Sequence, residues 1–207
     1  MTLVSLLDYA SVLIFAITGA LVASRAQLDL LGFAFLACLT ALGGGTLRDL
    51  LLDRDPIFWI GQPSYLGVAS AAALVVFFTA HLLESRYRTL IWLDSAALAV
   101  AVAAGAGVEQ LLAHAPIIVI LMGMITGCMG GLMRDVVVGQ VPLVLKQGEL
   151  YATAAFAGAA AAVFCAEYLT TQPMSLLVGA GVTWVLRAGS LLWGWHLPVY
   201  KSTPPKV

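Results

Sequence analysis

Two stretches of the sequence share one layout: "GGGTLRDLLLDRDP" at residues 43–56 and "GGLMRDVVVGQVP" at residues 130–142. Each places glycines in a long apolar run and follows them with an adjacent arginine and aspartate, Arg48–Asp49 and Arg134–Asp135. A charge at the centre of a membrane costs at least about 2.5–3.5 kcal/mol on insertion scales. Glycines and charged residues inside helices that are apolar enough to span a membrane therefore call for a structural or functional explanation.

The composition is that of a membrane protein. The chain has 207 residues, of which 61% are hydrophobic and 10% are charged, whereas about a quarter of the residues in soluble domains are charged. The charged residues fall in short clusters between apolar runs long enough to span a bilayer. The composition thus predicts an all-α integral membrane protein, with a single transmembrane domain over residues 1–207. No basic run suits nucleic acid, so the expected surroundings are membrane lipid.

Seven apolar windows predict seven transmembrane helices, near residues 4–24, 30–52, 65–83, 91–112, 116–138, 150–168 and 174–195. Their loops divide the basic residues unequally between the two sides. One side holds Arg25, Arg86, Arg88, Lys146, Lys201 and Lys206, and the other holds Arg54 alone. The positive-inside rule then predicts an outside N-terminus and a short cytoplasmic tail at residues 196–207.

The two opening stretches belong to a longer repeat with a constant offset of 86 residues. That offset superimposes Leu7–Asp8 on Leu93–Asp94 and Tyr65 on Tyr151, besides the glycines, the Arg-Asp pairs and the prolines. It predicts a duplication, with repeat one at about 4–83 and repeat two at about 91–168. Three helices are an odd number, so the second copy enters the membrane inverted. Proteins of this kind usually place their transport site at the repeat interface, where corresponding helices are interrupted.

The glycines allow two interpretations. They permit close packing of helices, or they mark a break that exposes backbone carbonyls to a water-filled path. The charged pair that follows, and its repetition, favour the break. We therefore predict kinks at Gly44 and Gly130, in the second and fifth transmembrane helices.

The arginines either extend to the headgroup layer or point into the protein. The Asp that follows each Arg, and a further apolar turn, favour the interior. Neighbouring helix positions lie about 100° apart, so an Arg and its own Asp face each other poorly. The predicted pairs are therefore Arg48 with Asp135 and Arg134 with Asp49, across the repeats. Asp8 and Asp94 are interpreted mainly as helix N-caps, and Arg187 either reaches the cytoplasmic surface or turns inward.

Other motifs carry less information. Residues 123–127, "GMITG", are typical of a helix contact, and the three cysteines are interpreted as small buried hydrophobes. There is no metal-ligand spacing and no nucleophile-elbow, HExxH or phosphate-loop signature. We therefore expect no metal, no cofactor and no enzymatic activity.

Five stretches of the sequence belong together: "LDYASVLIFAITGAL", "GGGTLRDLLLDRDPIFW", "LDSAALAV", "MGMITGCMGGLMRDVVVGQVPLVL" and "ELYATAAF". Together they resemble the prokaryotic relatives of the trimeric intracellular cation (TRIC) channels, also described as a glycine-transporter-like family. The resemblance implies a homotrimer in the prokaryotic plasma membrane, with one hydrophilic pore per protomer. It implies that the pore is bounded by the kinked second and fifth helices and conducts potassium and other monovalent cations. The implied pore and gating residues are Gly43, Gly44, Gly45, Arg48, Asp49, Gly130, Gly131, Arg134 and Asp135. The second copy departs from the glycine motif at Met129.

Arginines along a cation pore would repel the permeant ion unless aspartates neutralise them. The alternative function is a carrier for glycine or a similar small zwitterion, whose carboxylate an arginine would favour. The sequence supports both and does not separate them.

Overall fold

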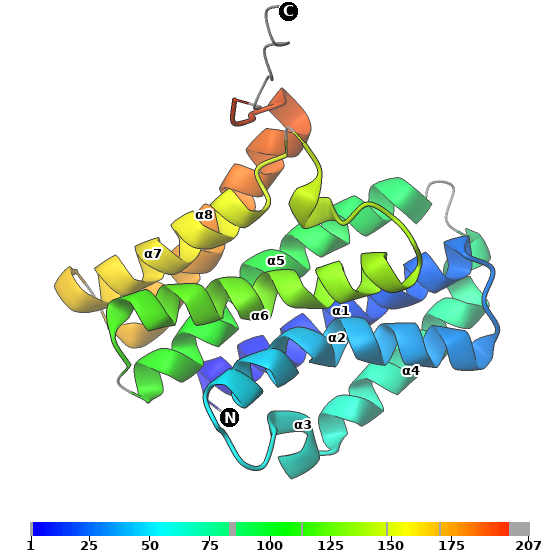
Figure 1. Ribbon diagram of the computed structural model, residues 1–207, viewed down its shortest axis with the longest axis horizontal. Helices are drawn as coiled ribbons and strands as arrows, with labels where there is room; N and C mark the ends of the chain where they lie inside the picture. The colour runs from blue at the N-terminus through cyan, green and yellow to red at the C-terminus, as the bar shows by residue number, and fades with distance from the viewer. Residues whose placement is uncertain (1, 83–85, 113, 148, 170, 199–207) are drawn as a thin grey trace, which may run out of the picture.

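The protein is a bundle of long helices in the computed structural model, which describes residues 2–198 except 83–85, 113, 148 and 170 (Figure 1). The seven long helices are α1 (Leu3–Arg25), α2 (Leu30–Leu51), α4 (Ser64–Thr79), α5 (Arg86–Leu111), α6 (Pro116–Val137), α7 (Ala152–Tyr168) and α8 (Gln172–Trp193). Three short helices lie between them: α3 (Phe58–Gly61), η1 (Ala80–Leu82) and η2 (Leu143–Leu145).

All seven predicted windows correspond to helices. Six are long and apolar enough to cross a membrane, and α7, with 17 residues, is a shorter apolar helix. α5 begins five residues before the predicted start, at Arg86. The polar residues of its first turn concealed this start, because a helix can continue past the apolar layer once its side chains reach water.

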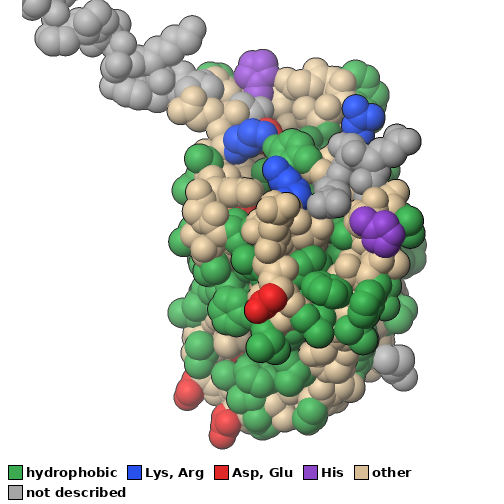
Figure 2. All heavy atoms as spheres, turned by 90° about the vertical axis from the view of Figure 1, so that its right-hand side faces the viewer, with side chains coloured by type: hydrophobic (Ala, Val, Ile, Leu, Met, Phe, Trp, Pro, Cys, Tyr) green, Lys and Arg blue, Asp and Glu red, His purple; other side chains and the backbone are tan. Residues whose placement is uncertain are grey.

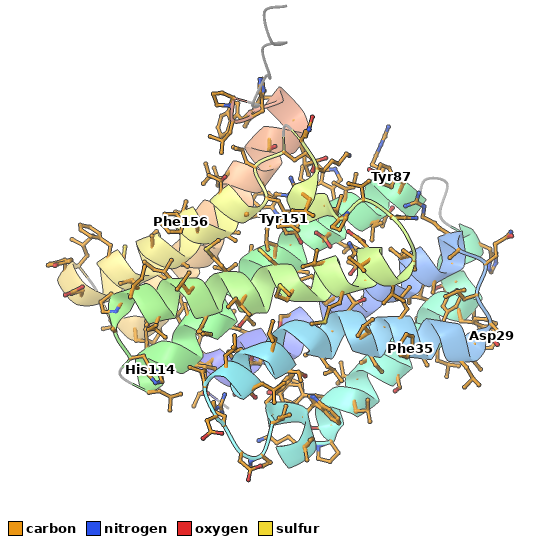
Figure 3. All side chains as sticks on the ribbon, viewed as in Figure 1. Asp29, Phe35, Tyr87, His114, Tyr151 and Phe156 are labelled. Atoms are coloured by element: carbon orange, nitrogen blue, oxygen red, sulfur yellow. The ribbon has the colours of Figure 1, made fainter. Side chains whose placement is uncertain are left out.

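The short connections place the helix ends at two opposite ends of the bundle. The end formed by the last turn of α1, the first turn of α5 and the α6–α7 connection carries the exposed side chains of Arg25, Arg88 and Lys146; we call it the basic end. Figure 2 faces this end and shows Lys and Arg side chains gathered on its upper part. Figure 3 shows Tyr87 and Asp29 at this end and His114 at the opposite end. Lys201 and Lys206 lie outside the described residues.

The centre of the bundle is a close crossing of α2 and α6. A Cβ added at Gly44 would collide with the carbonyl oxygen of Thr126, and one added at Gly130 would collide with that of Thr40. Across these glycines both helices continue without interruption within the described residues. The expected break that frees carbonyl groups is therefore absent here, and the glycines serve the backbone contact instead. Whether the axes bend at Gly44 and Gly130 stays a prediction.

The glycines of "GMITG" also serve a helix contact, but inside the protomer. Added Cβ atoms at Gly123 and Gly127 would lie 3.1 Å from the Val102 carbonyl oxygen and 2.7 Å from the Val102 side chain, both on α5. The predicted helix contact is confirmed. Because this face is already covered by α5, it does not offer the oligomer contact that small residues there would otherwise suggest.

Candidate functional site

Two clusters of charged residues, each built around a buried arginine, lie at opposite ends of the α2–α6 pair. The first, the Arg48 cluster, consists of Asp8, Arg48, Asp49 and Arg54. The Arg48 side chain is 1% exposed; its Nε donates to Asp49 Oδ1 over 2.9 Å, and its Nη1 lies 3.6 Å from Asp8 Oδ1. Arg54 Nη1 donates to the same Asp49 oxygen over 2.9 Å. The other Asp49 oxygen accepts the backbone N–H of Phe58 over 2.8 Å.

The second, the Arg134 cluster, consists of Thr18, Asp94, Arg134, Asp135 and Tyr151. The Arg134 side chain is fully buried; its Nε donates to Asp135 Oδ1 and its Nη1 to Asp94 Oδ1, both over 2.8 Å. Thr18, from repeat one, accepts a further bond from Nη1 over 3.0 Å. Tyr151 donates its hydroxyl to the second Asp94 oxygen over 2.8 Å, so Asp94 is held by Arg134 of α6 and by the residue that precedes α7.

In both clusters the aspartate that follows the arginine fastens the chain beyond the helix. Asp135 Oδ2 accepts the backbone N–H of Leu143 over 3.0 Å, as Asp49 does for Phe58. The turn after each helix also matches, with a left-handed residue at Asp53 and at Gly139, 86 residues apart. Equivalent residues of the two stretches thus build equivalent local structures.

The prediction that both arginines point into the protein is confirmed, but the predicted partners are wrong. Arg48 and Arg134 pair with Asp49 and Asp135, their own neighbours. A backbone N–H of the following loop holds each carboxylate within reach of the neighbouring guanidinium. Pairing across the repeats cannot occur, because the two clusters lie at opposite ends of the bundle.

The N-cap interpretation of Asp8 and Asp94 is also wrong. Thr2 caps α1 by accepting from the Ser5 N–H, and both aspartates lie inside their helices. They are instead the second acidic partners of Arg48 and Arg134. Their match at the 86-residue offset was the sequence signal for this role, as it was for Tyr151.

Two cavities adjoin the clusters. One of about 380 Å³ opens at the basic end, and its lining includes Tyr87, Arg134, Asp135, Gln140, Leu143 and Lys146. The other is a void of about 10 Å³ beside the Arg48 cluster, lined among others by Asp8, Gly45, Phe58 and Thr126. About one water molecule would fill a void of this size. Between them lies the backbone contact of α2 and α6 at Gly44 and Gly130.

Sequence reasoning left Arg187 undecided, and the structure places it inward. Its side chain is fully buried in α8, with Nη2 donating to Glu149 Oε2 over 2.8 Å. Its guanidinium carbon lies 4.9 Å from the centre of the Tyr151 ring. Glu149 begins the stretch "ELYATAAF" but was assigned no role from the sequence, because it belongs to a loop whose path only the fold defines. Over the described residues, no group of three His, Cys, Asp or Glu side chains could hold a metal ion.

These features define a multi-pass membrane protein with buried Arg-Asp clusters along its central helix pair. The model of the family described as "Glycine transporter" matches the chain twice, at residues 5–81 and 91–167. The two matches are displaced by 86 residues, and each covers three long helices. The chain therefore belongs to this family, the prokaryotic relatives of the TRIC channels.

Curated relatives of similar length support this membership. The inner membrane protein YadS of Escherichia coli K12, described as UPF0126, is 35% identical, and the match covers 96% of each chain. A UPF0126 membrane protein of Vibrio cholerae is 36% identical over 98% of this chain and 84% of its own. The solved TRIC trimeric intracellular cation channel orthologue from Rhodobacter sphaeroides is 41% identical. It superimposes with a TM-score of 0.90, over 94% of this chain and 100% of that chain.

Proposed function

We propose that the protein is a passive channel for potassium and other monovalent cations, with one pore inside each protomer of a homotrimer. The observation that carries the proposal is the series of polar groups along α2 and α6. From the basic end it runs through the larger cavity, the Arg134 cluster, the glycine crossing, the small void and the Arg48 cluster. The likeness to the R. sphaeroides cation channel orthologue supports it.

The acidic residues of the two clusters compensate the positive charge of the arginines, which would otherwise repel a cation. The Arg48 cluster contains two acids and two bases, Asp8 and Asp49 against Arg48 and Arg54, so its charges balance. In the Arg134 cluster two acids, Asp94 and Asp135, face one base. A path lined by neutral or net acidic clusters does not repel a cation, and hydroxyl and carbonyl oxygens can replace part of its hydration shell.

The same proposal includes the arrangement of the protomer. Residues 4–83 and 91–168 are inverted repeats related by a pseudo-two-fold axis, with α8 as the added helix. The basic end faces the cytoplasm, with the N-terminus outside. The nine glycine, arginine and aspartate residues of the two stretches line or gate the pore. When the pore opens, α2 and α6 bend at Gly44 and Gly130, and their backbones separate. The proposal assigns no catalytic role.

The alternative, a carrier for glycine or a similar zwitterion, is tested in the same experiment. Purified protein in liposomes is assayed in parallel for potassium flux and for uptake of labelled glycine. The channel predicts potassium flux that glycine does not change, and no saturable uptake. Saturable glycine uptake without ion conduction would replace the channel with the carrier.

A further inference from the structure

The connection between α6 and α7 covers the larger cavity and is fastened at several points. Leu143 and Lys146, both in this connection, line the cavity. The Leu143 N–H is held by Asp135, and the Lys146 ammonium donates to the Tyr87 hydroxyl over 3.2 Å. We call residues 138–147, 149 and 150 of this connection the inner cover. It lies across the route from the basic end to Arg134.

α8 fastens the inner cover near its far end. Arg187 binds Glu149 over 2.8 Å, and Ser190, one turn further along α8, accepts the backbone N–H of Leu150 over 3.0 Å. Glu149 also binds Lys146 over 2.8 Å. It therefore bridges a fully buried guanidinium and an exposed ammonium.

The hydrogen bonding of Arg187 is incomplete. Its Nε and Nη1 are buried and have no hydrogen-bond partner among the described residues. Buried donors without partners are costly, and water would satisfy them if the inner cover moved away. Arg48 Nη1 and Arg134 Nη2 are likewise buried without such a partner, so all three arginines share this feature. What distinguishes Arg187 is that its one charged hydrogen bond among the described residues goes to Glu149, a residue of the α6–α7 connection.

The matching connection in repeat one is held differently in the part of the chain that the structure describes. Residues 52–65 are fastened by partners within repeat one: Trp59 Nε1 donates to Thr46 over 2.9 Å, and Tyr9 and Ser64 share a hydrogen bond of 2.6 Å. Within the described residues, this connection makes no contact with α8 equivalent to those of Glu149 and Leu150. Contact with the helix outside the repeat thus distinguishes the connection at the basic end.

We infer that Glu149 and Arg187 form a latch through which α8 holds the inner cover over the cavity at the basic end and limits ion entry. Breaking the latch lets the cover move and exposes the cavity wall. The inference rests on the proposed channel for its effect on ion flux, but movement of the cover can be measured without flux.

The test uses a cysteine in the cavity wall. Leu90 lines the cavity and is 3% exposed. Leu90→Cys is made in the full chain with Cys38, Cys128 and Cys165 replaced by Ala. The rate of modification by a charged, membrane-impermeant thiol reagent is measured from the basic end. Adding Glu149→Gln should raise this rate about tenfold, as expected when a charged hydrogen bond is lost, and should raise potassium flux in liposomes.

Further variants separate a latch from general loosening. Arg187→Gln should raise the rate as Glu149→Gln does, and the double variant should go no further, because both remove the same contact. Glu149→Asp keeps the charge and shortens the side chain, so an intermediate rate is expected; it also serves if Glu149→Gln does not fold. Glu167→Gln, an exposed acid at the opposite end, is the matched control and should leave the rate unchanged.

The outcomes for latch and channel are distinguishable. Folded Glu149 and Arg187 variants with the modification rate of the Glu167→Gln control would overturn the latch. Absence of potassium flux in the parent and in every variant, together with a raised modification rate, would overturn the channel and keep the latch.

Discussion

The Arg48 and Arg134 clusters occupy matching positions of the two repeats, yet they are held with different firmness. Arg134 lies 2.8 Å from Asp94, whereas Arg48 lies 3.6 Å from Asp8. Thr18 adds a hydrogen bond to Arg134. The position that matches Thr18 in repeat two is Ala104, which has no hydroxyl group for Arg48.

The difference in firmness indicates where each end can change. Arg134 is fixed by two acids and a hydroxyl, so at the basic end the movable part is the cover above it. Arg48 is held less closely, and Arg54 competes for the same Asp49 oxygen; the matching position in repeat two is Gln140. At the opposite end, Arg48 itself is therefore the part that can move.

The largest expected effect comes from removing the firmly held arginine. Arg134→Ala leaves the Asp94 and Asp135 carboxylates buried without their cation, which typically costs about 3–5 kcal/mol. Arg48→Ala should cost less, because Asp49 keeps Arg54 and Asp8 is partly exposed. Thermal unfolding in detergent measures both. Equal losses of stability would contradict the difference between the clusters.

The second prediction concerns the crossing that the two repeats share. Gly44→Ala and Gly130→Ala each push a methyl group against a backbone carbonyl on the facing helix, and overpacking of this kind costs about 1–3 kcal/mol. The two variants should lose similar stability, because the contacts are equivalent. Gly67→Ala and Gly181→Ala, with no atom within 4 Å of the added carbon, are the controls. Stability equal to that of the controls would show that the close contact at the crossing does not constrain these two positions.

A smaller effect is expected from the hydroxyl that only one cluster has. Thr18→Val removes the hydrogen bond to Arg134 Nη1 at almost constant volume and should cost about 1 kcal/mol. Thr79→Val, at an exposed helical threonine with a similar bond to its own backbone, controls for the change of residue type. If both variants unfold at the same temperature, Thr18 does not stabilise the cluster.

The smallest effect is a pH dependence at the basic end. Burial acts to raise the pKa of Glu149, but hydrogen bonds from Lys146 and Arg187 outweigh it, so the pKa lies below its ordinary value of 4.5. A lowered folded-state pKa gives stability that is present above the unfolded-state pKa and lost as the pH falls through the folded value. Modification of Leu90→Cys should therefore accelerate below about pH 4.5, when protonation of Glu149 weakens its pairs with Lys146 and Arg187.

The control for this pH effect is the Glu149→Gln protein, which has no carboxyl group to titrate at that position. Its modification rate, corrected for reagent chemistry, should stay constant over the same range. An equal acceleration in both proteins would assign the effect to other acids, such as Asp135 in the cavity wall.

The sequence predicted the helices and the burial of the arginines because both follow from hydrophobic length and the cost of charge in lipid. It did not predict the pairing of Arg48 with Asp49, which depends on how the following loop returns its N–H groups to the carboxylate. The sequence favoured a break at Gly44 because the backbone that packs against this glycine, at Thr126 of α6, is far away along the chain. The Arg187–Glu149 pair could likewise not be predicted from the sequence, because the two residues are 38 positions apart and only the fold brings them together.

The most direct test of the pore inside the protomer is blockage from the cavity. Leu90→Cys protein in liposomes is modified to completion with a bulky charged thiol reagent, and potassium flux is measured before and after. Leu82→Cys, 70% exposed at the same end but outside the cavity lining, is treated in parallel. A pore inside the protomer predicts that modification abolishes most of the flux through Leu90→Cys and leaves that through Leu82→Cys unchanged. Full modification of Leu90→Cys with undiminished potassium flux would contradict it.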